Sequence, residues 1–231
     1  MLNKDDVVLE RQYHWISHEL RCDTPVYGGG EGLTILHEKQ IASGSNCNSS
    51  KLTFSNHLGT HVDVPYHFIQ SGKKVSDYQA EQWLFHKTLL VTLEISPDEI
   101  IRLSMLQDVL DVESDIELLL IKTGFEQYRQ SETYWQHSPA FSPDIAYYLK
   151  DHFPSISAIG FDAISLTGYQ HRALGKETHH AFLSNDIRIF EDLHLLQMTS
   201  DLSIKQVIAM PLRFEHADGS PCTIMVISNH E

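Results

Sequence analysis

Short runs of consecutive apolar residues recur along the chain and are rich in β-branched side chains, so we predict that they form buried strands. These runs cover residues 88–95, 116–123, 156–161, 204–210 and 223–228. Their apolarity is nearly continuous, which indicates strands that are covered on both faces of a sheet.

Helical patterns lie between these runs. In residues 142–153, Ser142 can cap the N-terminus, Pro143 suits the first helical position and Asp144 complements the helix dipole. One apolar face of this helix contains Ile145, Tyr148, Leu149 and Phe153. Residues 96–100, SPDEI, begin in a similar way and predict a second helix start.

Strands that alternate with helices predict an α/β fold, although the order of the strands does not follow from one sequence. No internal repeat, low-complexity tract or linker divides the chain, and residues 28–32, GGGEG, are a candidate flexible loop. We therefore predict a single domain over residues 1–231.

The composition excludes several classes of partner. The chain has 231 residues, 42% of them hydrophobic, and its formal net charge of -14 repels nucleic-acid phosphates and anionic membrane surfaces. We expect no nucleic-acid or membrane partner. Three widely spaced cysteines, the absence of a signal-peptide pattern and the absence of a long apolar span indicate a cytoplasmic protein.

Three histidines and one aspartate gather in residues 55–68, SNHLGTHVDVPYHF. They occupy odd-numbered positions, which an extended segment directs to one face, and they are His57, His61, Asp63 and His67. A straight strand would hold His57 and His61 about 13 Å apart, near the limit for two imidazoles that share a metal. The chain must therefore bend between them; Gly59 permits the bend, and Pro65 stiffens the path that follows.

Two imidazoles and one carboxylate suit a divalent ion, because neutral nitrogen donors leave the ion Lewis-acidic while an anionic oxygen secures it. The alternative is a polar loop without a metal. A second polar cluster contains His179, His180 and Glu191. Composition alone favours a polar loop followed by a short strand. A metal-binding role for this cluster is favoured only if a binuclear site needs a second bridging carboxylate.

Most of the 15 histidines are expected to be ordinary surface or half-buried side chains. Those outside the two clusters, including His194, are predicted to have no ligand role. His18 and His171 are the two that can still approach the pocket.

The stretch HLGTHVDVPYHF resembles the H-x-G-T-H-x-D-x-P-x-H signature of the cyclase family, which includes bacterial kynurenine formamidases and isatin hydrolases. Weaker similarity to this family is found at residues 16–20, 24–29, 119–125, 158–166 and 210–224. The resemblance covers nearly the whole chain and implies the swivelling β/β/α fold of that family.

The resemblance also implies a ligand set. By motif position, two ions would be bound by His57, His61, Asp63, His179 and Glu191. His57 and His61 would bind one ion, His179 would bind the other, and the two carboxylates would bridge them. The family's histidine stands twelve positions before its glutamate, which selects His179 over His180.

Two further roles follow from the resemblance. His67 would transfer protons, and Tyr27 takes the place of an aromatic residue, usually tryptophan, that lines the substrate pocket. Two departures concern the region around this pocket: GGGEG replaces P-G-D after the aromatic residue, and Cys222 and Thr223 replace an arginine that often follows D-G-S-P. They bear on the substrate and leave the implied ligands intact.

The resemblance implies a metal-dependent amidohydrolase that acts on C–N bonds other than peptide bonds. We predict that metal-activated water cleaves an arylformamide such as N-formylkynurenine, a compound of tryptophan catabolism, with His67 as general acid and base. Zinc is the first choice for one or two ions, and manganese is the second. The alternatives are a ring-opening hydrolase of a lactam or lactone such as isatin, and a non-catalytic metal-binding homologue. The expected partners are a small-molecule substrate and further copies of the chain in a homodimer or homotetramer, in which loops of a neighbouring copy can complete the pocket.

Overall fold

The computed structural model describes residues 11–110, 115–199 and 202–229. Within these residues, a nine-stranded sheet is formed by β1 (Arg11–Trp15), β4 (His61–Asp63), β5 (Leu84–Phe85), β6 (Thr88–Thr92), β8 (Leu118–Lys122), β10 (Ala158–Phe161), β11 (Arg188–Glu191), β12 (Ser203–Pro211) and β13 (Gly219–Asn229). The strand order is β5-β12-β13-β4-β11-β10-β8-β6, and β1 pairs with β13. Because β12 also approaches β6, the sheet curves toward closure.

The sheet has a parallel part and an antiparallel part. Strands β6, β8, β10 and β11 run parallel to one another. Strand β4 is antiparallel to both of its neighbours, β11 and β13. All five apolar runs in the sequence form strands of this sheet, as predicted.

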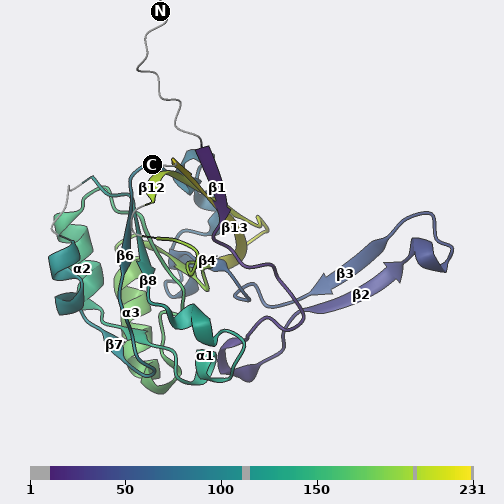
Figure 1. The fold of residues 1–231 in the computed structure, drawn as a ribbon, viewed down its shortest axis with the longest axis horizontal. Coiled ribbons are helices and arrows are strands. Elements are labelled where there is room, and N and C mark those ends of the chain that lie inside the picture. Colours follow the sequence, from purple (N-terminus) through teal and green to yellow (C-terminus); the bar gives the residue numbers. More distant parts are fainter. Residues whose placement is uncertain (1–10, 111–114, 200–201, 230–231) are drawn as a thin grey trace, which may run out of the picture.

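Helices α2 (Asp144–His152) and α3 (Arg172–Ser184) lie side by side against the parallel strands (Figure 1). Alternate residues of β8 pack into two different hydrophobic cores, one on each face of the sheet. Leu119 and Ile121 pack with the helices, whereas Leu118 and Leu120 pack with the antiparallel strands. This double burial explains why the strand is apolar at successive positions.

The predicted helix at residues 142–153 is confirmed, but its start is displaced. The helix begins at Asp144 with Pro143 as its N-cap residue, and Ser142 makes no side-chain cap. The predicted helix start at residues 96–100 is wrong. The Glu99 carboxylate accepts a hydrogen bond from the Ser96 N–H, which closes a single turn before the chain becomes extended.

The smaller elements connect the sheet and the helices. The strands β7 (Ile100–Ile101) and β9 (Ala140–Phe141) pair in parallel, and α1 (Thr133–Gln136) is one short helix. The 3-10 helices are η1 (Tyr27–Gly29), η2 (Ile41–Ser43), η3 (Pro65–His67), η4 (Val75–Asp77), η5 (Ala80–Trp83), η6 (Leu103–Met105), η7 (Gln107–Val109), η8 (Phe125–Tyr128) and η9 (Tyr169–His171). In the described residues, no helix is long and apolar enough to cross a membrane.

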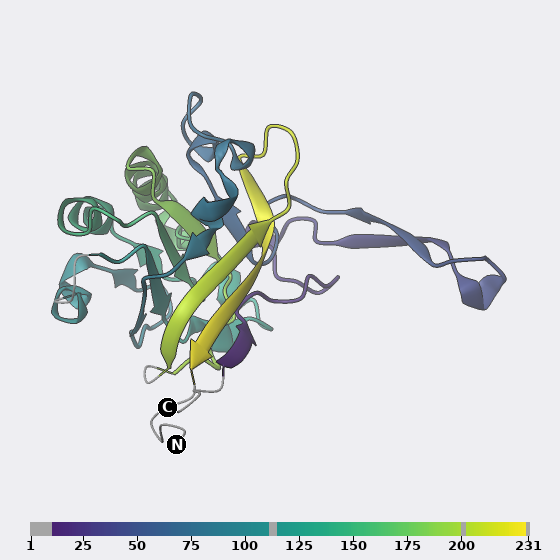
Figure 2. The same ribbon diagram turned by 90° about the horizontal axis from the view of Figure 1, so that it is seen from above.

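A two-stranded hairpin extends far from the rest of the molecule. It consists of β2 (Thr34–Lys39) and β3 (Ser49–Thr53), which pair only with each other. Both views show it as an arm that points away from the sheet and the helices (Figures 1 and 2). Its side chains are mostly exposed, including the apolar Leu36, Ile41 and Leu52.

Candidate active site

The centre of the site is β4, a strand of three buried residues. His61 and Asp63 are two positions apart on this strand, so their side chains share one face of the sheet. Glu191, the last residue of β11, lies opposite His61 in the register of the two strands. Pairing on both edges of β4 thus fixes the position of three polar side chains.

Turns on both sides of β4 return the chain toward the same face. Gly59 has a φ of 68°, so the predicted bend between His57 and His61 is present. After β4, Pro65 starts the 3-10 helix η3, which carries His67. The extended segment predicted from His57 to His67 is therefore limited to β4, and the two flanking bends bring these two imidazoles to a centroid distance of 4.1 Å.

His179 comes from helix α3, where the sequence had favoured a polar loop. The strand that the sequence placed after this loop is present as β11. His179 is buried and stacks on the ring of Phe68 at a centroid distance of 4.7 Å. The next residue, His180, is exposed, so burial distinguishes the two histidines in favour of His179.

One cavity of about 280 Å³ receives all the predicted site residues. It is lined by the implied metal ligands and by the two residues assigned to proton transfer and substrate contact: His57, His61, Asp63, His179, Glu191, His67 and Tyr27. His18 and His171 do not line it.

The spacing between nitrogen and oxygen atoms in this cavity suits a metal ion. His61 Nε2 is 3.4 Å from one oxygen each of Asp63 and Glu191, and His179 Nε2 is 3.6 and 3.5 Å from their other oxygens. These distances exceed the roughly 2.7–2.9 Å of charge-assisted hydrogen bonds. Two ligands that each lie about 2.0–2.1 Å from a tetrahedral ion are about 3.3 Å apart, so the residues fit a bound ion.

Backbone carbonyls orient both buried imidazoles. His61 Nδ1 lies 2.8 Å from Gly59 O, and His179 Nδ1 lies 2.8 Å from Gly175 O. A donor hydrogen on Nδ1 leaves the lone pair on Nε2, the atom that faces the carboxylates. Such a hydrogen bond behind a histidine is the usual support of a metal ligand.

Two groups of potential ligands around the cavity overlap at Asp63. One group contains His57, His61 and Asp63, and the other contains Asp63, His179 and Glu191. A third group contains His57, His67 and Asp218. Asp63 belongs to the first two groups, since its Oδ1 faces His57 at 2.7 Å and its Oδ2 faces His179. The contact between His57 and Asp63 has the length of a hydrogen bond, so the spacing that fits an ion is found where His61 and His179 face Asp63 and Glu191.

The buried carboxylates make the cavity strongly attractive to cations. Burial alone would lower the pKa of His179, but the facing carboxylates of Asp63 and Glu191 outweigh it and raise this pKa to about 10. The pKa of His61 is likewise held well above its usual value against the effect of burial. Burial would raise the pKa of Asp63, but its hydrogen bonds with imidazoles hold it well below the usual range. Protons or a metal ion can supply the positive charge that this site requires.

Tyr27 borders the cavity at the start of η1, and two adjacent glycines there have positive φ values. Its hydroxyl is buried and makes no hydrogen bond of ordinary geometry within the described residues. The Tyr27 ring contacts Tyr169, which in turn contacts Trp135. An aromatic wall therefore stands beside the carboxylates, with one polar atom available to a bound molecule.

Asp218 is a functional candidate that the sequence reasoning did not assign. Its Oδ2 lies 2.9 Å from His67 Nδ1 and 3.1 Å from His57 Nε2. Asp218 is the first residue of the D-G-S-P segment and directly precedes β13. Gly219, the first residue of β13, lies opposite Asp63 in the sheet register. The D-G-S-P motif was therefore a sequence feature that could have identified Asp218 as a candidate. Only the pairing of β13 with β4 brings its carboxylate to the histidines.

Comparison with known protein families identifies the family to which this chain belongs. The family model described as a cyclase matches residues 15–167, about two thirds of the chain. The chain belongs to the cyclase family. Kynurenine formamidase from Bacillus thuringiensis subsp. konkukian is 31% identical over 217 residues, which cover 91% of this chain and 95% of the relative. Kynurenine formamidase from Bacillus cereus is 32% identical over 185 residues, covering 78% and 79%. The protein is thus a hydrolase of the cyclase family, as its sequence predicted.

Solved structures confirm the predicted fold. Isatin hydrolase A from Labrenzia aggregata, bound to benzyl benzoate, superimposes with a TM-score of 0.81 and 18% identity over 95% of this chain and 94% of the other. An isatin hydrolase bound to the product analogue thioisatinate gives a TM-score of 0.77 at 16% identity, over 96% and 94%. The mixed α/β domain with its curved sheet is therefore the fold of the cyclase family.

Proposed function

We propose that this protein is a metal-dependent arylformamidase, with a substrate similar to N-formylkynurenine. The enzyme is an amidohydrolase that acts on C–N bonds other than peptide bonds, the class to which its kynurenine formamidase relatives point. Metal dependence is supported by the distances of 3.4–3.6 Å between the nitrogen atoms of two imidazoles and the oxygen atoms of two buried carboxylates.

The ligands in this proposal are His57, His61, Asp63, His179 and Glu191. A divalent ion held by them would supply a Lewis acid that polarises the substrate carbonyl and lowers the pKa of water. Zinc suits the two buried imidazoles, and manganese is the second choice because two carboxylates share the site. The overlap of the two ligand groups at Asp63 favours two ions over one.

His67 is the general acid and base in this proposal. Its Nδ1 is held by Asp218, while its Nε2 points toward the interior of the site, 3.9 Å from Asp63 Oδ2. The imidazole would accept a proton from the attacking water and donate it to the leaving nitrogen. The C–N bond breaks, the water oxygen becomes part of formate, and the aromatic amine is released.

The shape of the cavity supports a small aromatic amide. A volume of about 280 Å³ lies just below the usual range for ligand pockets, roughly 300–1,000 Å³, so the substrate should be small. Tyr27 and Phe68 line it and offer ring surfaces on which an aromatic substrate can pack. A substrate of this kind would connect the enzyme with tryptophan catabolism.

The test is a substrate panel assayed on protein loaded with zinc or manganese. Formate release from N-formylkynurenine supports the proposal, particularly if metal analysis finds one or two ions per chain. Loss of isatin absorbance without formate release from any formamide would replace it with a ring-opening hydrolase. Bound metal without turnover of any amide, ester or lactone would indicate a non-catalytic homologue.

The assembly in this proposal is a homodimer or homotetramer that uses the hairpin β2–β3. The side chains of Leu36, Ile41 and Leu52 are 58%, 59% and 52% exposed on an arm that contacts little of its own chain. Packing against a second copy would bury them. Sedimentation of the protein, with Leu36→Ser as the variant, tests this assembly, and a monomeric wild-type protein would contradict it.

We also place the enzyme in the cytoplasm. Its three cysteines, Cys22, Cys47 and Cys222, are free, and the first two are exposed. Exposed free thiols suit a reducing compartment. Fractionation of cells that produce the protein tests this location.

A further inference from the structure

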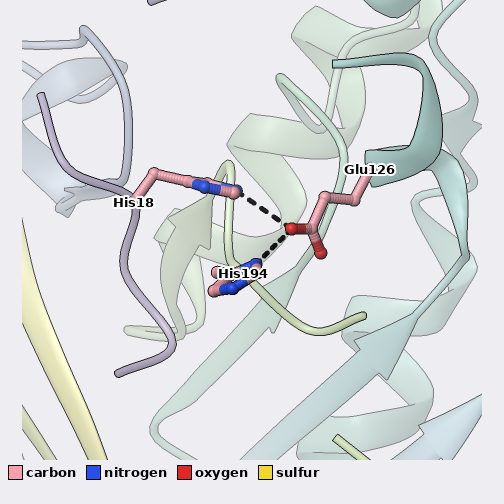
Figure 3. Close-up of side chains that lie close together, drawn as sticks. All are labelled: His18, Glu126 and His194. Atoms are coloured by element: carbon pink, nitrogen blue, oxygen red, sulfur yellow. Dashed lines mark hydrogen bonds and ion pairs between the residues drawn. The ribbon is translucent and has the colours of Figure 1, made fainter. Parts of the chain in front are cut away.

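A second group of metal-ligating side chains lies outside the candidate active site. His18, Glu126 and His194 each offer one ligand atom, and these atoms lie within 4.8 Å of one another. Figure 3 shows the two imidazoles converging on one oxygen of the Glu126 carboxylate. None of the three side chains lines the active-site cavity, so the proposed hydrolysis does not account for this group.

Glu126 is held so that one of its oxygens is available. Its Oε2 accepts hydrogen bonds from the N–H groups of Leu195 and Leu196, each at 2.8 Å. Its Oε1 faces the two histidines, and its side chain is only 3% exposed. The backbone donors therefore fix the carboxylate as a ligand that presents a single oxygen.

His18 is the partner whose interactions remain incomplete. Its Nε2 is buried and makes no hydrogen bond of ordinary geometry within the described residues, although it lies 3.4 Å from Glu126 Oε1. This distance is close to the separation of about 3.3 Å between two ligands of one tetrahedral ion.

His194 completes the group from the segment that follows β11. Its Nδ1 contacts Glu126 Oε1 directly, and its ring centroid is 4.8 Å from that of His18. Its side chain is 37% exposed, so the ring has room to withdraw by the distance that an ion between them would need. The same exposure gives an ion a path from solvent.

We propose that His18, Glu126 and His194 form a separate site for a divalent transition-metal ion, with zinc as the best match. Two imidazole nitrogens disfavour calcium and magnesium, which prefer oxygen ligands. Two histidines and one glutamate are a known ligand set for zinc, and solvent can occupy the fourth position.

The position of the site gives it a structural role. His194 N–H donates to Ile16 O, and His18 N–H donates to Thr60 Oγ1. Thr60 precedes the proposed ligand His61, and His194 lies three residues after the proposed ligand Glu191. An ion here would join the segment after β1, the helix η8 and the segment after β11, close to the ends of the strands that carry the active site.

The experiment counts zinc ions bound by the full-length protein at equilibrium, in the wild type and in His194→Ala. His194 is partly exposed and lies outside the active site, so the variant should fold. His152→Ala is the matched control, because His152 is an exposed histidine on α2 that is remote from both sites. Glu126→Gln is the second variant, since it keeps the size of the side chain and removes its charge.

We expect His194→Ala and Glu126→Gln to bind one zinc ion fewer than the wild type and His152→Ala. We also expect zinc to raise the Tm of the wild type more than that of His194→Ala, because a ligand that binds only the folded state stabilises it. An equal zinc count in the wild type and His194→Ala overturns the proposal. A loss of zinc in His61→Ala reports on the active site alone, so the two sites are tested independently.

Discussion

Asp218 Oδ2 lies between two imidazoles of the candidate active site, 2.9 Å from His67 Nδ1 and 3.1 Å from His57 Nε2. Burial would raise the pKa of Asp218, but the hydrogen bonds with the two histidines outweigh it and lower this pKa below its usual value. Asp218 is therefore ionised at neutral pH. It fixes the ring of His67 with Nε2 directed inward, the arrangement that a proton-transfer residue requires.

The first prediction concerns this contact. Asp218→Asn should lower kcat on an arylformamide by about 10- to 100-fold, because loss of a carboxylate behind an active-site histidine disturbs its orientation and basicity. At saturating metal the content should match the wild type, since Asp218 is not among the proposed ligands, whereas the metal affinity should fall because Asp218 also contacts the proposed ligand His57. Steady-state kinetics and metal analysis check this, with Asp151→Asn on the exposed side of α2 as the control. An unchanged kcat would remove Asp218 from the mechanism.

The second prediction separates proton transfer from metal binding. His67→Ala should lower kcat by about 10²- to 10⁴-fold, the usual contribution of general acid–base catalysis, and should retain its metal. His61→Ala, the matched variant at a proposed ligand, should lose metal from the active site together with activity. The measurement combines turnover with metal content after reloading. If His67→Ala lost the metal but regained turnover on reloading, His67 would be a ligand and another group would carry the proton.

A large part of the site follows from the sequence because it lies within eleven consecutive residues. The short sequence separation of His57, His61, Asp63 and His67 and the bend at Gly59 place these side chains close together without knowledge of the sheet, although shared parity acts only for His61 and Asp63 on β4. The apolar runs also identify the five strands. Burial on both faces, as predicted, is found in β8 and β10, whereas β12 and β13 alternate between buried and more exposed positions.

The remaining part depends on contacts that one sequence does not contain. Asp218 reaches the histidines only because β13 pairs with β4, and strand order is not encoded in local patterns. His179 was assigned by resemblance, while its local composition indicated a loop. Helix α3 forms there because Phe182 and Ala181 are buried in the core, which is a tertiary effect.

The third prediction concerns the support of His179. A Cβ atom at Gly175 would lie 2.1 Å from Thr167 Oγ1 and 2.5 Å from Thr167 Cβ, so the two segments must separate. Gly175→Ala should therefore lower the free energy of unfolding by about 1–3 kcal/mol, as overpacking of a core does. Because Gly175 O orients His179, metal affinity should also fall.

The control for this substitution is Gly30→Ala, where a Cβ would be 3.4 Å from its nearest neighbour, Val26 Cγ1. Gly30→Ala should change the free energy of unfolding by less than about 0.5 kcal/mol, since Gly30 lies in an exposed loop. Denaturant unfolding and zinc titration measure both effects. Equal stabilities of the two variants would show that Thr167 moves aside without cost.

The fourth prediction concerns the pH dependence of stability at Asp162. Burial raises the pKa of this carboxyl to about 6, although the Thr123 N–H, the Thr123 hydroxyl and the Gly124 N–H all donate to it. The ordinary value is 3.8, so the folded state binds the proton at a higher pH than the unfolded state does. The contribution of Asp162 to stability therefore falls as the pH rises from about 4 to about 6, and is constant above that range.

The size of this effect follows from the shift of the pKa. A difference of about two pKa units corresponds to about 3 kcal/mol between the two ends of the range. Asp162→Asn cannot titrate, so the free energy of unfolding of the wild type minus that of the variant should decrease by about 2 kcal/mol between pH 4 and pH 6.5, and the rest of the change falls below pH 4. Taking the difference cancels the titration of the histidines, which both proteins share, and Asp151→Asn should show no such trend. A flat difference curve for Asp162→Asn would mean that the three donors offset the burial and that Asp162 has an ordinary pKa.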